Sequence, residues 1–245
     1  MNIILFEPGE AELSFLPPGD PRAGHLLSVL RARAGDSFTA GILNGMKGDM
    51  HILRAGEDGV GFRFVPRGPS EPLLPLDLII GLPRPLVTGR LLKDLAAMGL
   101  RSLHFVRTGL CEKSYMSGSL WKNHEYRRHL LEGLQQSGQT LLPDVRLHEN
   151  FDACLSLFAL GPRAAGHGDD VLRCVMHPGG AGLGEVPPRR SAVLAIGPER
   201  GWTPAELEKF TAEGFRVCGM GKRILRTEAA ALAAGAILLS RMGLM

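Results

Sequence analysis

The pattern of apolar and polar positions changes near residue 70 and divides the chain into two parts. Before that point, short apolar runs alternate with turn residues, which is the pattern of β-strands. Strands are expected over residues 2–6, 37–43, 49–54 and 59–65, with a turn at Asn44-Gly45 and one helix over residues 25–31. Residues 1–70 are therefore predicted to form a small β-module, and the proline-rich residues 66–75 are predicted to be a linker.

From residue 76 onward, apolar strands alternate with amphipathic helices. The predicted strands cover residues 76–82, 103–108, 144–148 and 171–177, and the predicted helices cover 85–99, 121–138 and 151–160. A glycine- and proline-rich loop is expected to follow, up to residue 190. Such alternation is typical of βαβ units, so residues 73–245 are predicted to form an α/β domain with a mainly parallel sheet.

In the last quarter of the chain, a buried strand is expected to lead directly into a helix. The apolar residues 192–196 precede the turn 197–201, which reads Gly-Pro-Glu-Arg-Gly. Thr203 suits the N-cap position, Pro204 the first helical residue, and Glu206 the acid that completes a capping box. Ligands of open α/β sheets bind at the carboxyl ends of strands, so this turn is a candidate binding site.

The same pattern then returns: residues 215–218 are expected to be a strand and residues 219–221 a turn, before a long Ala/Leu-rich helix. Thr227 and Glu228 suit the start of that helix as an N-cap hydroxyl and a first-turn acid. Arg226 does not, because a cation opposes the helix dipole at this end. We therefore expect Arg226 to have a functional role.

The two turns offer complementary chemistry. Gly197 and Gly201 permit close approach of the backbone to a ligand, and Glu199 can accept hydrogen bonds from ribose hydroxyls or an amino group. Apolar walls for an adenine ring are expected from Met220, Ile224 and Leu225. His177, at the end of a predicted strand, is expected either at the rim of the site or in a structural role.

Composition and charge exclude only a few classes of protein. The chain has 245 residues and a net charge of +3, which neither requires nor excludes a nucleic-acid partner. The N-terminus lacks the features of a signal peptide, and no apolar run reaches about 18 residues, so a cytoplasmic protein without a membrane span is expected. The four cysteines form no C-x-x-C pair, which favours reduced, buried thiols and no metal site.

Other ligand motifs are missing or lie in the wrong context. The glycines of residues 180–184 follow a predicted strand, but Pro187-Pro188 comes next, where a dinucleotide-binding turn would need to open a helix. The sequence contains neither a G-x-x-x-x-G-K-[ST] phosphate loop nor an H-E-x-x-H zinc motif. The two C-terminal turns therefore remain the best candidate site.

At these turns the sequence resembles a known family. IGPERGWTPAEL and GMGKRILRTEAAALAAGAIL resemble the RsmE-type RNA methyltransferases of the SPOUT superfamily, and HLLSVLRARAGD and LLEGLQQSGQTLLP are similar to two further segments of that family. The resemblance implies transfer of a methyl group from S-adenosylmethionine to N3 of a uridine in small-subunit (16S) ribosomal RNA. It also implies a homodimer, a PUA-like β-barrel over residues 1–70 that binds RNA, and a C-terminal trefoil knot.

The resemblance implies where the cofactor binds, and the charges of the arginines named below make them candidates for catalysis and for contacts to RNA. The methyl donor is expected on the two turns and near Met176-His177, with Arg226 as the catalytic residue. The expected cofactor-binding residues are Leu194, Ile196, Gly197, Glu199, Gly201, Met220, Gly221, Ile224, Leu225 and Thr227. The expected contacts to ribosomal RNA are Arg22, Arg31, Arg33, Arg84, Arg127, Arg128 and Arg200. No metal is expected.

The chain departs from the family pattern at several positions. Arg200 stands where a glycine is usual, Gln139 where an arginine is usual, and Ala229 where a threonine is usual. Two alternatives therefore stay open. One is a SPOUT methyltransferase that acts on another RNA base, and the other is a non-catalytic RNA-binding or ribosome-assembly factor.

Overall fold

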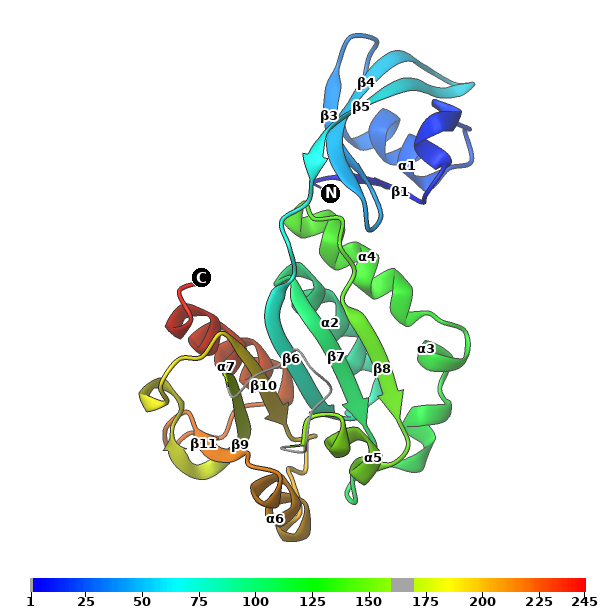
Figure 1. Ribbon diagram of the computed structural model, residues 1–245. Coiled ribbons are helices and arrows are strands. Elements are labelled where there is room, and N and C mark those ends of the chain that lie inside the picture. The colour runs from blue at the N-terminus through cyan, green and yellow to red at the C-terminus, as the bar shows by residue number, and fades with distance from the viewer. Residues whose placement is uncertain (1, 160–169) are drawn as a thin grey trace. The chain divides into compact units, whose positions relative to one another are not determined.

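The computed structural model describes residues 2–159 and 170–245, and the chain forms two compact units (Figure 1). The first comprises Met1–Pro72, Ala96–Gly99 and Leu130–Leu142, and the second comprises Leu73–Leu95, Leu100–His129 and Pro143–Met245. The prediction of a module over residues 1–70 did not include the two short segments from the middle of the chain that join the first unit.

The first unit is built on a mixed five-stranded sheet. Its strands are β1 (Ile4–Phe6), β2 (Phe15–Leu16), β3 (Ser37–Ile42), β4 (Met46–Gly56) and β5 (Gly59–Pro69), in the order β1-β3-β4-β5-β2. β1 pairs with β3 in parallel, and the other pairs are antiparallel. Four of these strands were expected, whereas β2 has only two residues and was missed. Closure of the sheet into a barrel stays a prediction.

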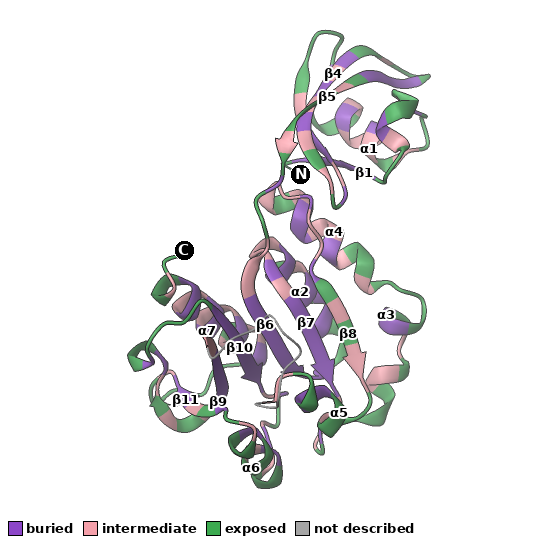
Figure 2. Cartoon of the chain, viewed as in Figure 1, coloured by how far each residue is buried: buried purple, intermediate pink, exposed green. Residues whose placement is uncertain are grey.

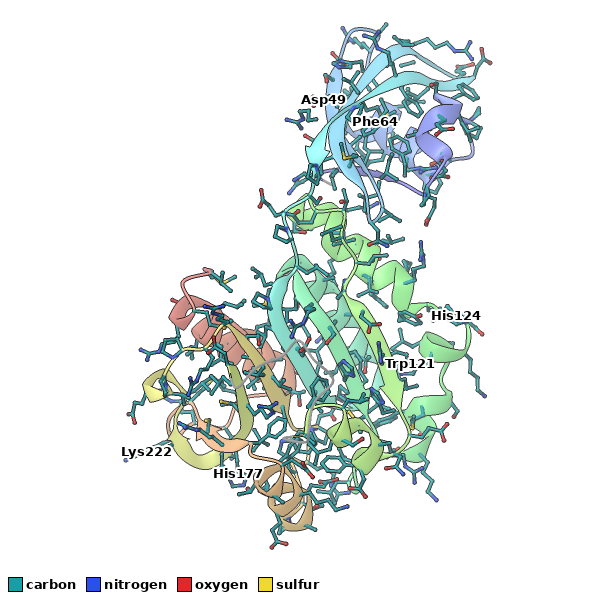
Figure 3. All side chains as sticks on the ribbon, viewed as in Figure 1. Asp49, Phe64, Trp121, His124, His177 and Lys222 are labelled. Atoms are coloured by element: carbon teal, nitrogen blue, oxygen red, sulfur yellow. The ribbon has the colours of Figure 1, made fainter. Side chains whose placement is uncertain are left out.

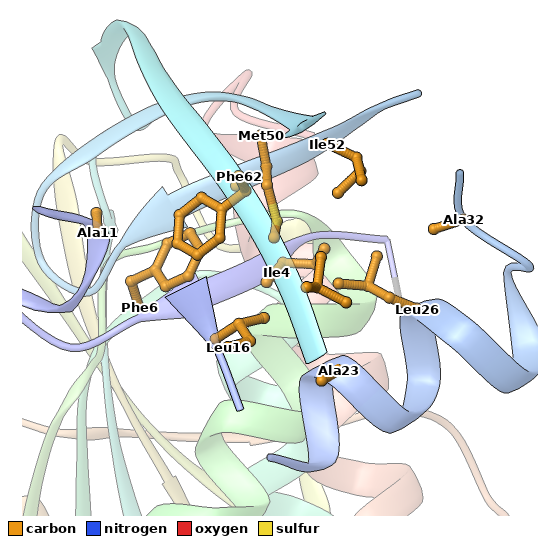
Figure 4. Close-up of a cluster of buried hydrophobic side chains, with 12 residues drawn as sticks. Ile4, Phe6, Ala11, Leu16, Ala23, Leu26, Ala32, Met50, Ile52 and Phe62 are labelled. Atoms are coloured by element: carbon orange, nitrogen blue, oxygen red, sulfur yellow. The ribbon is translucent and has the colours of Figure 1, made fainter. Parts of the chain in front are cut away.

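Apolar side chains from the sheet and from the helical segment pack into one core. The helical residues are η1 (Glu10–Leu13), α1 (Pro21–Gly24) and the π-helical turn η2 (His25–Val29). Phe6 stacks on Phe62 with 5.1 Å between ring centroids, and Leu26 and Met50 are fully buried in the same cluster (Figure 4). In Figure 3, Asp49 and Phe64 mark the strands β4 and β5 of this unit.

The segment Leu130–Leu142 completes the first unit. Leu134 packs in a second apolar cluster with Ile3 and Leu5, and the hydroxyls of Thr140 and Ser70 lie 2.6 Å apart. The linker predicted over residues 66–75 is shorter than expected, and both of its predicted bounds are wrong. β5 continues to Pro69 and the next strand, β6, begins at Leu74, because these residues extend the ladders of their sheets.

The second unit contains a six-stranded sheet in which every pair is parallel, so the predicted α/β fold with a parallel sheet is confirmed. The strands are β6 (Leu74–Gly81), β7 (Leu100–Val106), β8 (Asp144–His148), β9 (Val171–Gly182), β10 (Ser191–Ile196) and β11 (Arg216–Gly219), in the order β11-β9-β10-β6-β7-β8. The central strands are buried along most of their length, and all of β10 is buried (Figure 2). The trefoil knot stays a prediction.

The helices that follow β6 along the chain are α2 (Pro85–Ala97), α3 (Ser119–Lys122), α4 (Tyr126–Ser137), α5 (Phe151–Ser156), α6 (Pro204–Ala212) and α7 (Thr227–Arg241), with short turns η3 (Lys113–Ser117) and η4 (Leu183–Glu185). Most of α4 belongs to the segment Leu130–Leu142 of the first unit. α7 lies against β10 and β6, while α5 lies against β7 and β8. Among the described residues, no helix combines the length and the apolar character needed to cross a membrane.

Three sequence-based boundaries need correction. The helix expected over residues 121–138 is interrupted, because His124 (labelled in Figure 3) adopts a left-handed φ of 55° between α3 and α4. The loop expected after residue 177 begins with strand, since β9 continues to Gly182 and pairs there with β11. The helix expected over residues 151–160 ends at Ser156, and residue 160 lies outside the described residues.

A chain of polar groups runs from β6 across β7 to the edge strand β8. Arg101 binds Asp77 in a bidentate ion pair, Ser102 donates to Asp77, and His104 lies next to Ser102. Burial, together with the neighbouring His148 ring, lowers the pKa of His104 to about 4, and burial also lowers the pKa of His148. Both imidazoles are therefore neutral at physiological pH.

Candidate functional site

A pocket of about 430 Å³ lies where β10 and β11 end, beside residues 176–178 of β9. Its walls come from residues within the ranges 84–87, 176–178, 196–202 and 219–230. We call it the strand-end pocket. It brings together the two turns that the sequence singled out and adds the start of α2 to them.

Nine of the ten predicted cofactor residues line this pocket, namely Ile196, Gly197, Glu199, Gly201, Met220, Gly221, Ile224, Leu225 and Thr227. Leu194 does not line it. Its side chain is fully buried inside the sheet because β10 continues for two more residues before the turn. Arg226, predicted to be catalytic, also lines the pocket.

The first turn is tight and requires glycine. A Cβ added to Gly197 would lie 3.1 Å from the Cα of Gly201, and Gly201 itself has a φ of 72°. The predicted capping box after the turn is confirmed: the Thr203 hydroxyl accepts from the Glu206 amide, and the Glu206 carboxylate accepts from the Thr203 amide. The same carboxylate accepts from the Gly109 amide at 2.8 Å, which anchors the start of α6 to the loop after β7.

The second turn lies against β9. A Cβ on Gly219 would come within 2.9 Å of the Gly180 carbonyl oxygen, so the chain approaches there more closely than a side chain allows. Gly221 follows with a φ of 89°. These two glycines hold the turn at the pocket wall without placing side chains inside it.

α7 begins at the predicted place, but its N-cap differs from the prediction. Arg226 occupies the N-cap position and makes no side-chain capping bond, so the capping role expected for Thr227 is wrong. The buried hydroxyl of Thr227 instead donates to the carbonyl oxygen of Gly197, at 3.2 Å. One hydrogen bond therefore connects the first turn to the helix that follows the second.

Charged side chains surround the pocket mouth. The Glu199 carboxylate accepts from the backbone amide of Arg84 at 3.2 Å, and the Arg84 guanidinium lies 3.5 Å from the same carboxylate. Arg90 lies 4.0 Å from Glu228. Arg223 and Arg226 line the pocket and are exposed. Glu199 thus holds the loop before α2, while the arginines give the mouth a basic character.

The other predicted RNA contacts have different surroundings. Arg31, Arg33, Arg127, Arg128 and Arg200 are exposed. Arg22 is a correction, because its half-buried guanidinium binds Asp20 at 2.6 Å and Glu10 at 2.7 Å and also donates to the Leu5 carbonyl. These bonds use its donors inside the first unit, so a structural role replaces the predicted phosphate contact.

His177, expected either at the rim of the site or in a structural role, lines the pocket (labelled in Figure 3). Its Nδ1 accepts from the Gly179 amide at 3.2 Å. Val87, Trp202 and Arg223 are among the lining residues that were not predicted. Trp202 and Arg223 lie beside the two turns and could have been included on that ground. Val87 is distant in sequence and carries no local signal for the site.

Comparison with known proteins gives a consistent result. The profile of the RNA methyltransferase domain family matches residues 69–239. The chain is 38% identical over 250 residues to ribosomal RNA small subunit methyltransferase E of Treponema pallidum, covering 98% of this chain and 91% of that protein. It is 29% identical over 243 residues to ribosomal RNA small subunit methyltransferase E 1 of Borreliella burgdorferi, with 99% of both chains covered.

Solved structures share the fold at lower sequence identity. A ribosomal RNA small subunit methyltransferase E from Neisseria gonorrhoeae, bound to S-adenosyl methionine, gives a TM-score of 0.76 at 21% identity, over 98% of this chain and 97% of that one. A probable rRNA-methyltransferase from Porphyromonas gingivalis gives 0.77 at 20% identity, over 99% of both chains. The similarity extends over nearly the whole length of the chain.

Proposed function

Because the chain belongs to the ribosomal RNA small subunit methyltransferase E family, we propose that it transfers a methyl group from S-adenosylmethionine to N3 of a uridine in small-subunit (16S) ribosomal RNA. The strand-end pocket is the cofactor site in this proposal. The observation that carries it is the hydrogen bond between Thr227 and Gly197, which joins both motif-bearing turns in one pocket.

The pocket suits the cofactor. Its volume of about 430 Å³ lies within the range of about 300–1,000 Å³ that small-molecule sites occupy. Ile196, Met220 and Leu225 supply apolar walls, and Glu199 supplies a carboxylate for hydroxyl or amino groups. When bound, S-adenosylmethionine supplies an electrophilic methyl group on a sulfonium.

The protein's main task is to position the reacting groups and to stabilise charge. Removal of the N3 proton leaves negative charge on the uracil ring and its oxygens. Arg226 is exposed at the pocket wall, where its guanidinium can donate to those oxygens. We assign it this role, because a cation at the N-cap of α7 does not serve the helix itself.

RNA approaches the pocket through its basic mouth. Arg84, Arg223 and Arg226 lie there, and the exposed Arg200 lies on the adjoining first turn. Because N3 is on the Watson–Crick edge, the target uridine must be unpaired or flipped out of a helix. Arg31, Arg33, Arg127 and Arg128 are further candidate phosphate contacts, and the β-module is proposed to bind RNA.

We also propose that the protein acts as a homodimer in the cytoplasm. Ile224 is 84% exposed and Leu225 is 41% exposed, next to the pocket mouth, and a second chain that covers them would remove apolar surface from water. Light scattering is expected to give twice the chain mass. A monomeric mass for the wild type would contradict the dimer without affecting the proposed reaction.

Two measurements on purified protein test the function. Calorimetric titration is expected to show one S-adenosylmethionine bound per chain, and a folded protein without binding would favour a non-catalytic RNA-binding factor. Incubation with small ribosomal subunits that lack the modification is expected to produce 3-methyluridine, detected by nucleoside mass spectrometry. A different methylated nucleoside would indicate another target base.

A further inference from the structure

Three potential metal ligands from separate segments meet on one side of the parallel sheet. They are His104 on β7, His148 at the end of β8, and Cys154 on α5. One ring nitrogen of each histidine and the Cys154 Sγ all lie within 4.8 Å of one another. His104 and Cys154 are buried, His148 is half-buried, and none of the three lines the strand-end pocket.

The direction of the hydrogen bonds determines which nitrogen of His104 carries a lone pair. Ser102 donates its proton to the Asp77 carboxylate at 2.6 Å, so its oxygen can accept from His104 Nε2–H at 3.0 Å. His104 Nδ1 is then the unprotonated nitrogen. It lies 2.9 Å from His148 Nε2, so these two ring nitrogens face each other.

The surroundings of His104 match those of histidines that bind metals. Such a histidine donates its second N–H to a polar group that fixes the ring, often one connected to a carboxylate. Here Ser102, which is hydrogen-bonded to the Asp77 carboxylate, is that polar group. Arg101 Nε lies 2.9 Å from Asp77 Oδ1, and its guanidinium balances the charge of the carboxylate. The ring of Phe158 packs edge-on against His104, with 4.8 Å between centroids, and further limits its movement.

We propose that His104 Nδ1, His148 Nε2 and Cys154 Sγ form a binding site for a zinc-class divalent ion. Two imidazoles and a thiolate are ligands that zinc prefers, and the half-buried His148 allows water to provide a fourth ligand. Tetrahedral zinc sets its ligand atoms about 3.3–3.6 Å apart. To enclose the ion, the two ring nitrogens, now 2.9 Å apart, would move apart by a few tenths of an ångström, and the other ligand atoms, which lie within 4.8 Å, would close by up to about 1.2 Å.

Metal binding exchanges the proton of the Cys154 thiol for the ion, and no atom changes its oxidation state. The Cys154 thiol loses its proton to solvent as the sulfur–metal bond forms. His148 moves its N–H proton from Nε2 to Nδ1, which frees the Nε2 lone pair for the ion. The bound ion would tie α5 to β7 and β8, so we assign the site a structural role apart from methyl transfer.

The test uses the full-length protein after treatment with a chelator, with Co²⁺ as a spectroscopic probe for zinc. One equivalent of Co²⁺ per chain is expected to produce visible ligand-field bands and a sulfur-to-cobalt charge-transfer band in the near ultraviolet. Added Zn²⁺ should abolish both. Cys154→Ser should lose the charge-transfer band, and His148→Gln should weaken the affinity at least about tenfold.

Two controls make the result decisive. Cys111→Ser should leave the spectrum unchanged, because Cys111 lies in a loop outside the cluster. Cys174→Ser tests a rival thiol pair, since the sulfurs of Cys174 and Cys218 lie 3.6 Å apart. Each variant's fold is checked by circular dichroism in the absence of metal. No binding by the wild type, or binding lost in Cys174→Ser but kept in Cys154→Ser, would overturn the proposal.

Discussion

Thr227 and Gly197 connect the two halves of the strand-end pocket. The Thr227 hydroxyl donates to the Gly197 carbonyl oxygen at 3.2 Å, although the two residues are 30 positions apart. The first turn follows β10 and Thr227 opens α7, so this bond fixes the distance between two walls that local sequence builds separately.

Replacing Thr227 with valine should loosen the pocket while keeping the shape of the side chain. A buried hydrogen bond of this kind contributes about 1 kcal/mol, so unfolding in urea should show a loss of that size. Affinity for S-adenosylmethionine, measured by calorimetry, should fall several-fold. Thr227→Ser keeps the hydroxyl and should bind like the wild type; equal affinities for the valine and serine variants would contradict the role of the bond.

Arg226→Ala should separate cofactor binding from catalysis. Loss of one donor to a developing negative charge typically lowers kcat by about 10²–10³-fold. S-adenosylmethionine affinity should change little, because the side chain is exposed at the wall and its proposed partner is the uracil. The matched control is Arg223→Ala, for which RNA binding should weaken while kcat at saturating RNA is retained. If kcat in Arg226→Ala equals that of the wild type, our assignment of Arg226 is wrong.

The affinity for RNA should depend steeply on salt. Each phosphate contact adds about 0.7–0.9 to the slope of log affinity against log salt concentration, so Arg200→Ala should reduce that slope by one such step. Arg146→Ala serves as the control, because Arg146 pairs with Asp144 on β8 and does not line the pocket. Filter binding between low and physiological salt measures both. A slope unaffected by Arg200→Ala would remove Arg200 from the RNA surface.

Arg22 should control how the first unit responds to acid. Hydrogen bonds from Arg22 lower the pKa of Asp20 below 3.8 and that of Glu10 below 4.5. Lowered carboxyl pKa values stabilise the folded state above the unfolded pKa, and that stability is lost as the pH falls through the folded values. The wild type should therefore lose stability below about pH 4.5.

Arg22→Leu should weaken this acid dependence and reduce stability at neutral pH by about 1–3 kcal/mol, because two carboxylates lose their partner. Hydrogen exchange of peptides from β1 and α1 against pH reports on this unit directly. Arg63→Leu, at an exposed position on β5, should behave like the wild type. An unchanged pH profile in Arg22→Leu would show that the network contributes nothing to stability.

Local patterns predicted much of the fold. The capping box at Thr203, the strand Asp144–His148 and the start of α7 at Thr227 all follow from short-range signals. The helix break at His124 did not, because it depends on a left-handed residue with no glycine or proline to mark it. The extension of β9 to Gly182 could not be predicted either, because its glycines were interpreted as a loop. A Cβ on Gly180 would lie 2.4 Å from the Cys218 backbone, so glycine is needed there for close packing of two strands.

Residues of the candidate site could likewise be predicted where short-range signals mark them, but not where the tertiary fold brings them together. Residues on the two turns could be predicted because the turns carry their own glycines and helix caps. Arg22 was misassigned since its partners Glu10 and Asp20 are acids whose approach is set by the tertiary fold. Likewise, His104 and His148 share no motif spacing and meet only because β7 and β8 pair in parallel register.

The most direct test of the proposed function is nucleoside mass spectrometry of small-subunit ribosomal RNA from cells with and without this gene. We expect 3-methyluridine to disappear in the deletion strain and to return when the wild-type gene, but not Arg226→Ala, is supplied. Retention of 3-methyluridine in the deletion strain, or loss of a different mark, would contradict the account.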